Sequence, residues 1–160
     1  MSKPLSGVIA AIATPIDETG APDLKRAVNL ARYLLDNGCD GLNVLGTTGE
    51  ATSFSVDERK GVMGAYKENG LPMHRLMVGT GAASVTDAIA LTRHAAEFGF
   101  GGALVLPPFY YKGVPDDGLV AYIESLVKAT EQRPIPIYLY HFPAMALAEE
   151  IEILKRQLQE

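Results

Sequence analysis

Residues 41–50 read Gly-Leu-Asn-Val-Leu-Gly-Thr-Thr-Gly-Glu, an apolar run followed by two threonines between glycines. The apolar half, Gly41–Leu45, predicts a buried strand, and Gly46–Glu50 predicts the turn that follows it. Because glycine lets the backbone approach closely, the N–H and hydroxyl groups of such a turn can converge on a carboxylate or a phosphate. The same residues would also suit an ordinary strand-to-helix turn in which threonine caps the helix. The motif alone leaves both interpretations open.

The pattern on either side of this stretch repeats along the chain, with short apolar runs alternating with amphipathic stretches. Five apolar runs predict strands covered on both faces, as in a parallel sheet: Val8–Thr14, Gly41–Leu45, Leu76–Gly79, Gly102–Leu106 and Ile135–Tyr140. Four stretches between them predict helices: Asp23–Asn37, Ser55–Asn69, Ser84–Phe98 and Asp116–Thr130. Alternation of this kind is typical of a doubly wound sheet or of a (β/α) barrel.

Two features favour the barrel. No Gly-x-Gly-x-x-Gly motif follows the first predicted strand, so the dinucleotide-binding fingerprint of doubly wound sheets is missing. Polar or glycine-rich segments also follow strand after strand, and in a barrel those strand ends share the face where active sites form. A full barrel needs eight strands and roughly 250 residues. We therefore predict an α/β fold that is a partial parallel TIM barrel of about five strands, with a C-terminal amphipathic helix.

The sequence changes character after Pro143. Residues 1–143 are predicted to form the barrel part, and residues 144–160 a separate helix rich in strong helix formers. That helix carries an apolar stripe: Leu147, Ile151, Leu154 and Leu158. The stripe suits an ordinary barrel helix, and it also suits an appended or rebuilt segment that associates with a partner.

Composition excludes several classes of function. The net charge of −5 and the lack of a run of lysine and arginine argue against nucleic-acid binding. We expect no membrane insertion, since there is no apolar stretch of about 18 residues and no signal-peptide pattern. The lone Cys39 suits a reducing compartment, so a cytoplasmic location is expected. The histidines stand singly (His74, His94 and His141), and no metal site is expected.

With these motifs in view, residues 5–143 resemble the N-terminal half of the dihydrodipicolinate synthase/N-acetylneuraminate lyase family of pyruvate-dependent class I aldolases. The motifs that carry the resemblance follow the five predicted strands in order: Thr14-Pro15, Gly46–Glu50, Gly79-Thr80-Gly81, Pro107–Tyr111 and Tyr140-x-x-Pro143. The resemblance implies a (β/α)₈ barrel, usually a homotetramer. It also implies a lysine on strand six that forms a Schiff base with pyruvate or another 2-keto acid, with no cofactor.

The resemblance also implies roles for individual residues. Thr48, in the turn with Gly46 and Gly49, would hold the carboxylate of the 2-keto acid. Thr47 would link two tyrosines in a proton relay, with Tyr140 as the central acid/base. Tyr110 would be the tyrosine lent across the tight dimer, and Tyr111 is the weaker claimant to that role. A hydrogen-bonded chain of hydroxyls can move protons without charging a buried carboxylate.

Two positions depart from the family pattern. Met145 stands where synthases of the family have an arginine for the carboxylate of the aldehyde, so a sugar-acid aldolase, a dehydratase or a hydroxyproline-pathway activity fits as well. The strand-six lysine is also missing, because the seven lysines fall at the terminus, on predicted helices or in a loop.

These observations leave three hypotheses. The first is a fragment or truncated form of a pyruvate aldolase, inactive alone. The second is a non-catalytic half-barrel scaffold whose last helix drives homo-oligomerisation, with an engineered origin as one option. The third is a doubly wound domain that binds a small anion.

Overall fold

The computed structural model describes residues 4–111, 113–140 and 142. They contain one parallel sheet of five strands: β1 (Ile9–Ala11), β2 (Gly41–Val44), β3 (Leu76–Gly79), β4 (Gly102–Val105) and β5 (Ile137–Leu139). The strands lie in the order β1-β2-β3-β4-β5, and each neighbouring pair is parallel. A doubly wound sheet reverses its strand order, so this sequential order rules out the third hypothesis and confirms the arc of a barrel.

Four helices connect the strands: α1 (Leu24–Asp36), α2 (Val56–Glu68), α3 (Val85–Phe98) and α4 (Asp116–Ala129). Two single 3₁₀ turns, η1 (Ala51–Ser53) and η2 (Met73–Arg75), precede α2 and β3. The side chains of Asp23, Ser55 and Ser84 accept backbone N–H groups at the starts of α1, α2 and α3. Local capping therefore sets these helix starts where the sequence predicts them.

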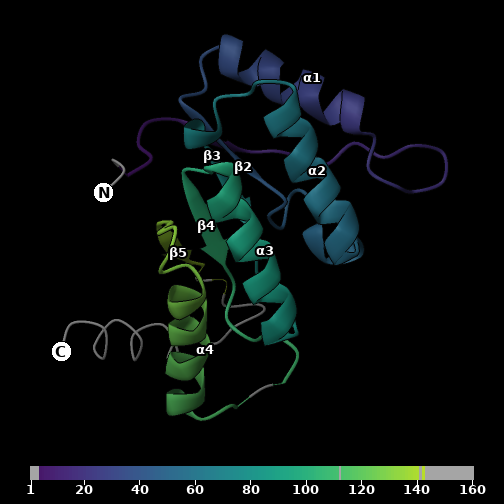
Figure 1. Ribbon diagram of the computed structural model, residues 1–160. Helices are drawn as coiled ribbons and strands as arrows, with labels where there is room; N and C mark the ends of the chain where they lie inside the picture. Colours follow the sequence, from purple (N-terminus) through teal and green to yellow (C-terminus); the bar gives the residue numbers. More distant parts are fainter. Residues whose placement is uncertain (1–3, 112, 141, 143–160) are drawn as a thin grey trace.

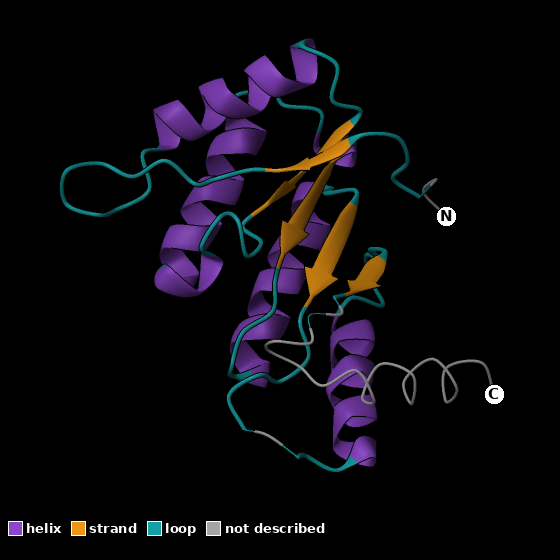
Figure 2. Cartoon of the chain, turned by 180° about the vertical axis from the view of Figure 1, so that it is seen from behind, coloured by secondary structure: helices purple, strands orange, loops and turns teal. Residues whose placement is uncertain are grey.

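All four helices cover one face of the sheet, which is clear when the chain is viewed from both sides (Figures 1 and 2). Alternate strand residues face this layer and are fully buried with the apolar sides of the helices: Leu42, Val44, Leu76, Val78, Ala103 and Val105. The main hydrophobic core thus lies between the sheet and the four helices.

The other face of the sheet carries a different set of side chains. Asn43 is paired in register with Met77, and Leu104 with Tyr138, and all four are half-buried. The Oδ1 atom of Asn43 is buried without a partner among the described residues. In a closed barrel the same positions line the interior.

Four predicted strands are shorter than expected: β2 and β4 each end one residue early, and β1 and β5 differ more. β1 stops at Ala11, although the N–H of Ile12 still donates to the carbonyl of Asn43 at 3.1 Å. β5 begins at Ile137 because the preceding residue is Pro136, which has no N–H to donate to a neighbouring strand.

The helix expected over residues 144–160, with Met145 and its apolar stripe, lies outside the described residues, as does Pro143. Within the described part of the chain, no helix has the length and apolar character needed to span a membrane.

Candidate active site

The turn after β2 is held in a strained, tightly bonded conformation. Leu45 and Glu50, at its two ends, both have positive φ, 51° and 49°. The N–H of Glu50 donates to the carbonyl of Thr47 at 3.1 Å, and the hydroxyl of Thr14 donates to the carbonyl of Gly49 at 2.8 Å. The cap of α2 is Ser55, so neither threonine of the turn serves as its cap. Thr47 and Thr48 therefore do not have the role of capping α2 that the sequence left open.

Glycines after β2 and β3 allow neighbouring loops to pack without side chains between them. A Cβ on Gly79 would overlap the carbonyl oxygen of Leu45, and a Cβ on Gly49 would lie 3.0 Å from the N atom of Leu45. A Cβ on Gly81 would lie 2.9 Å from the N atom of Leu106. The carboxyl ends of β2, β3 and β4 are therefore in backbone contact.

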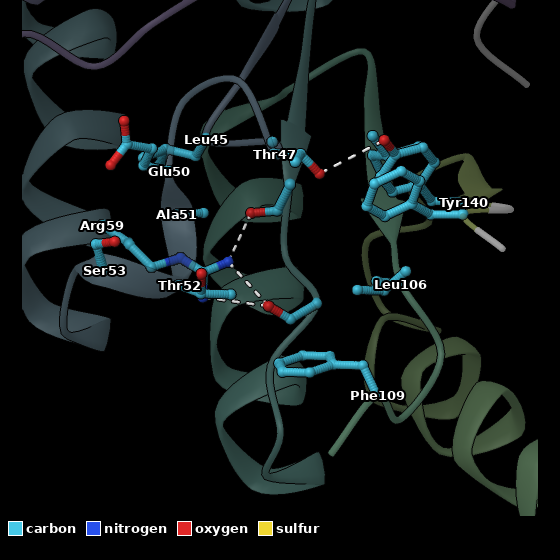
Figure 3. Close-up of a pocket in the computed structure, with 15 residues that line it drawn as sticks. Leu45, Thr47, Glu50, Ala51, Thr52, Ser53, Arg59, Leu106, Phe109 and Tyr140 are labelled. Atoms are coloured by element: carbon cyan, nitrogen blue, oxygen red, sulfur yellow. Dashed lines mark hydrogen bonds between the residues drawn. The ribbon is translucent and has the colours of Figure 1, made fainter. Parts of the chain in front are cut away.

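A cavity of about 160 Å³ opens at this edge of the sheet. Thr47 and Tyr140 meet there, and the Thr47 Oγ1 atom donates to the hydroxyl oxygen of Tyr140 at 3.5 Å (Figure 3). Tyr140 follows β5, and its N–H donates to the carbonyl of Val105 at 2.8 Å, which fixes the backbone beside β4. Two hydroxyl groups from residues 93 positions apart in the sequence are thus hydrogen-bonded to each other at the cavity.

Apolar side chains form much of the cavity wall. Leu104, Leu106 and Phe109 lie on the β4 side, and the ring of Phe142 stacks on that of Tyr140 with a centroid separation of 5.7 Å. An apolar wall with a few converging polar groups is typical of sites for small ligands.

The residues predicted for the site are only partly brought together. Gly46, Thr47 and Tyr140 line the cavity. Thr48 is exposed beside it, and Gly49 is buried beneath the turn; neither lines the cavity. Tyr110 is 73% exposed and packs edge-on against Tyr111 at a centroid distance of 5.1 Å.

Arg59, on α2, is a cavity residue that the motifs did not reveal. It is only 3% exposed, and its Nη2 donates to the carbonyl of Gly79 at 2.8 Å. Burial lowers the pKa of Arg59 to about 10, against the opposing effects of Asp87 and Tyr122, so the guanidinium remains charged at neutral pH. Its position on the buried side of α2 with Val62, Met63 and Tyr66 follows helical spacing, which is the signal that could have marked it.

No lysine is among the described residues that line this cavity. The lysines in the described part of the chain all lie on helices: Lys25, Lys60, Lys67 and Lys128. Lys3, Lys112 and Lys155 fall outside the described residues. Over residues 4–111, 113–140 and 142, no group of three or more His, Cys, Asp or Glu side chains could hold a metal ion.

Comparisons with known proteins agree with this arrangement. Residues 4–156 match the model of the Dihydrodipicolinate synthetase family. A 4-hydroxy-tetrahydrodipicolinate synthase from Synechococcus sp. (strain CC9605) is 39% identical over 140 residues, which is 88% of this chain and 45% of that relative.

Two solved structures have the same fold. The N-acetylneuraminate lyase of Proteus mirabilis superposes with a TM-score of 0.85 at 31% identity, over 98% of this chain and 52% of that one. A prophage protein of the dihydrodipicolinic acid synthase family from E. coli K12, in complex with pyruvate, gives a TM-score of 0.77 at 29% identity, over 88% and 46%. The chain spans about half the length of the relatives it matches. With its five-stranded arc and the motifs at the strand ends, it belongs to the Dihydrodipicolinate synthetase family.

Proposed function

We propose that this chain carries the carboxylate-binding turn and the hydroxyl relay of a pyruvate-dependent class I aldolase, a lyase. The observation that carries the proposal is the hydrogen bond between Thr47 and Tyr140 at the cavity on the carboxyl edge of the sheet. It joins the ends of β2 and β5 through two groups that can each give and accept a proton.

In this proposal Thr48, through its hydroxyl and its N–H, holds the carboxylate of pyruvate or another 2-keto acid, with Gly46 and Gly49 keeping the turn open to it. Thr48 is an exposed residue, which suits contact with a ligand. A relative of the same family binds pyruvate in its crystal structure, which supports this choice of ligand. A fixed carboxylate places the keto carbon at a defined point, as attack by an amine requires.

Thr47 and Tyr140 would move protons during formation and breakdown of the Schiff base. Attack of an amine on the keto carbon gives a carbinolamine, whose hydroxyl must gain a proton before it leaves as water. Tyr140 is the proposed donor, and Thr47 connects it to a second tyrosine. The exposure of Tyr110 suits a side chain that serves the site of a neighbouring subunit. This chemistry needs no metal and no organic cofactor.

The amine itself is the missing part of this proposal. The described lysines lie on helices, whereas a Schiff-base lysine needs a position in an apolar pocket that lowers its pKa. We therefore propose that the 160-residue chain binds the 2-keto acid without forming the imine, and is inactive alone. A cytoplasmic location, suggested by the lone Cys39, remains part of the same proposal.

The test is a pyruvate titration of the ¹⁵N-labelled chain, followed by NMR. Without a covalent bond we expect an affinity on the order of 1 mM. The amides of residues 46–49 should shift with pyruvate and not with pyruvamide, its neutral analogue. Thr48→Ala should weaken the response by about fivefold or more, because it loses one hydrogen bond to a charged group. Equal shifts with both ligands, or none with either, would refute the carboxylate site.

A second candidate function is that of a non-catalytic assembly scaffold. Two observations favour it: the half-buried sheet face opposite the helices, and the two strands β1 and β5 at the edges of the sheet. Exposed strand edges and apolar surfaces are favourable places for association. We propose a homo-oligomer to which residues 144–160 contribute their apolar stripe.

Light scattering tests this assembly. We expect a particle of at least twice the 17.1 kDa mass of one chain, and a shift toward the monomer in Leu154→Glu. Leu154 lies outside the described residues, so this test rests on the sequence pattern. The scaffold would be excluded by a folded monomer at chain concentrations of about tens of micromolar, where association of moderate affinity is detected. In that case Leu154→Glu would leave the measured mass unchanged.

A further inference from the structure

Arg59 makes an unusual set of contacts for a buried cation. Its guanidinium donates to the carbonyl of Gly79 at 2.8 Å through Nη2, and to the carbonyl of Gly81 at 3.2 Å through both Nη1 and Nη2. The Nε atom is buried and has no hydrogen-bond partner within the described ranges 4–111, 113–140 and 142. Among the described residues, no carboxylate lies within ion-pair distance of it. Asp87 is near enough to act on the pKa of Arg59 but forms no ion pair with it. Burying a charge without a directly paired carboxylate is costly, so the hydrogen bonds to the two carbonyls are the main compensation among the described residues.

Of the two carbonyls that Arg59 binds, one belongs to Gly79, the last residue of β3, and the other to Gly81 in the loop that follows. Gly79 packs directly on the turn after β2. Gly79 lies so close to the carbonyl oxygen of Leu45 that no Cβ would fit between them. On its other side, Leu45 has Gly49 against its N atom. Leu45 thus contacts two glycines, and one of these, Gly79, accepts a hydrogen bond from Arg59. Figure 3 shows Leu45 and Arg59 in the wall of the same cavity.

Leu45 needs such support because its backbone is strained. A leucine at φ 51° occupies the left-handed region, which costs a non-glycine residue on the order of 1 kcal/mol or more. Such a conformation persists only where the surroundings impose it. Leu45 immediately precedes Gly46, so its dihedral angles set the direction in which the N–H groups of the turn point.

We infer that Arg59 is a positioning residue that holds Leu45 and the Gly46–Gly49 turn in the conformation that receives a carboxylate. The inference rests on the proposed function, because it assigns the support of the site proposed there. It requires no contact between Arg59 and the ligand. The planar fork of the guanidinium binds both carbonyls at once, which a lysine ammonium at the same place cannot reproduce with the same geometry.

The experiment repeats the pyruvate titration with Arg59→Gln and Arg59→Lys. Loss of the charged hydrogen bonds should weaken the response of residues 46–49 about tenfold in Arg59→Gln, and less in Arg59→Lys, which keeps the charge. The ¹³C shifts of Leu45 should leave their left-handed values in Arg59→Gln. This signature separates a change in the turn from a general loss of stability.

Arg93→Gln is the matched control. Arg93 also donates to a backbone carbonyl, that of Ala129 at 2.9 Å, but it does so on the surface between α3 and α4. Its variant should bind pyruvate as the wild type does and keep the left-handed shifts of Leu45.

A titration of the wild-type chain tests the inference without depending on whether a variant folds. Pyruvate should shift the Nε–H signal of Arg59 and the amide of Thr80 together with the amides of residues 46–49. If residues 46–49 respond while these two signals stay still, or if Arg59→Gln folds and binds as the wild type does, the inference is overturned and the carboxylate site stands. If nothing responds in the wild type, the carboxylate site itself fails.

Discussion

The two faces of the sheet differ in how completely they are covered. On the helix side Leu42, Leu76 and Val78 are fully buried, with 0% exposure, and their neighbours in the chain point to the other side. There Asn43, Met77 and Leu104 remain half-buried. One face is therefore a finished core, and the other is a surface that the described residues do not complete. The relatives are about twice as long. The contrast shows that the described residues cover the helix-facing side of the sheet among themselves, and the opposite side only in part.

The largest effect should come from the covered face. Leu76→Ala removes a fully buried side chain between sheet and helices and should cost about 2–5 kcal/mol of unfolding free energy. Met77→Ala, one residue along on the opposite face, should cost about 1 kcal/mol or less, because its side chain is already partly in water. Urea unfolding of the two variants measures the contrast. Equal losses would mean that the two faces are equally covered in solution.

A pair of glycines should give changes of opposite sign. Gly79→Ala places a methyl group against the carbonyl of Leu45 and should destabilise the chain by about 1–3 kcal/mol. Gly61→Ala, on α2, adds a methyl group where no atom lies within 4 Å. It should stabilise the chain by about 0.5–1 kcal/mol, since alanine favours a helix. The same urea experiment serves both, and destabilisation by Gly61→Ala would show that the packing around α2 is closer than described.

His94, on α3, should make the helix layer sensitive to acid. Burial is the main cause that lowers the pKa of His94, and the charge of Lys60 adds to it. The charge of Glu97 and a hydrogen bond with the backbone of Lys60 oppose the shift without cancelling it. The folded chain therefore favours the neutral ring, and its stability is complete above the ordinary pKa of about 6.5. As the pH falls below that value the unfolded chain takes up the proton first, so the stability declines.

The expected loss of stability is small. It is measured as the difference between the urea concentrations at the unfolding midpoint at pH 7.5 and at pH 5.5, roughly one unit on either side of the ordinary histidine pKa. In His94→Gln the difference between the two midpoints should be smaller than in the wild type. An unchanged difference would assign the acid sensitivity to other groups.

Local signals in the sequence explain why so much of the fold could be predicted. The caps Asp23, Ser55 and Ser84 act within one turn of helix, and the apolar alternation fixes which strand residues face inward. Capping and apolar alternation do not predict the order of the strands. That prediction came from the polar residues that recur at the strand ends, which is typical of a barrel. The strand ends shifted where Pro136 and the turn into Thr14-Pro15 interrupt pairing.

The candidate site was predicted less completely, because its decisive contacts are not local. The meeting of Thr47 and Tyr140 follows from their positions at strand ends, and it was anticipated through the family resemblance. The positive φ of Leu45 was not, since leucine has no preference for that region and the backbone contacts of Leu45 with Gly79 and Gly49 are not visible in the sequence. Arg59 was missed for the same reason: its partners are carbonyls on another loop.

The central proposal is that this chain holds a 2-keto acid at the edge of its sheet, while no lysine of the described residues is placed on a strand to capture it. Borohydride trapping with pyruvate, followed by intact-mass and peptide mass spectrometry, tests this most directly. The account predicts no reduced pyruvyl adduct on the chain alone, under conditions in which the NMR titration shows residues 46–49 to be occupied. A reduced adduct on any lysine of this chain, accompanied by aldol turnover, would contradict it.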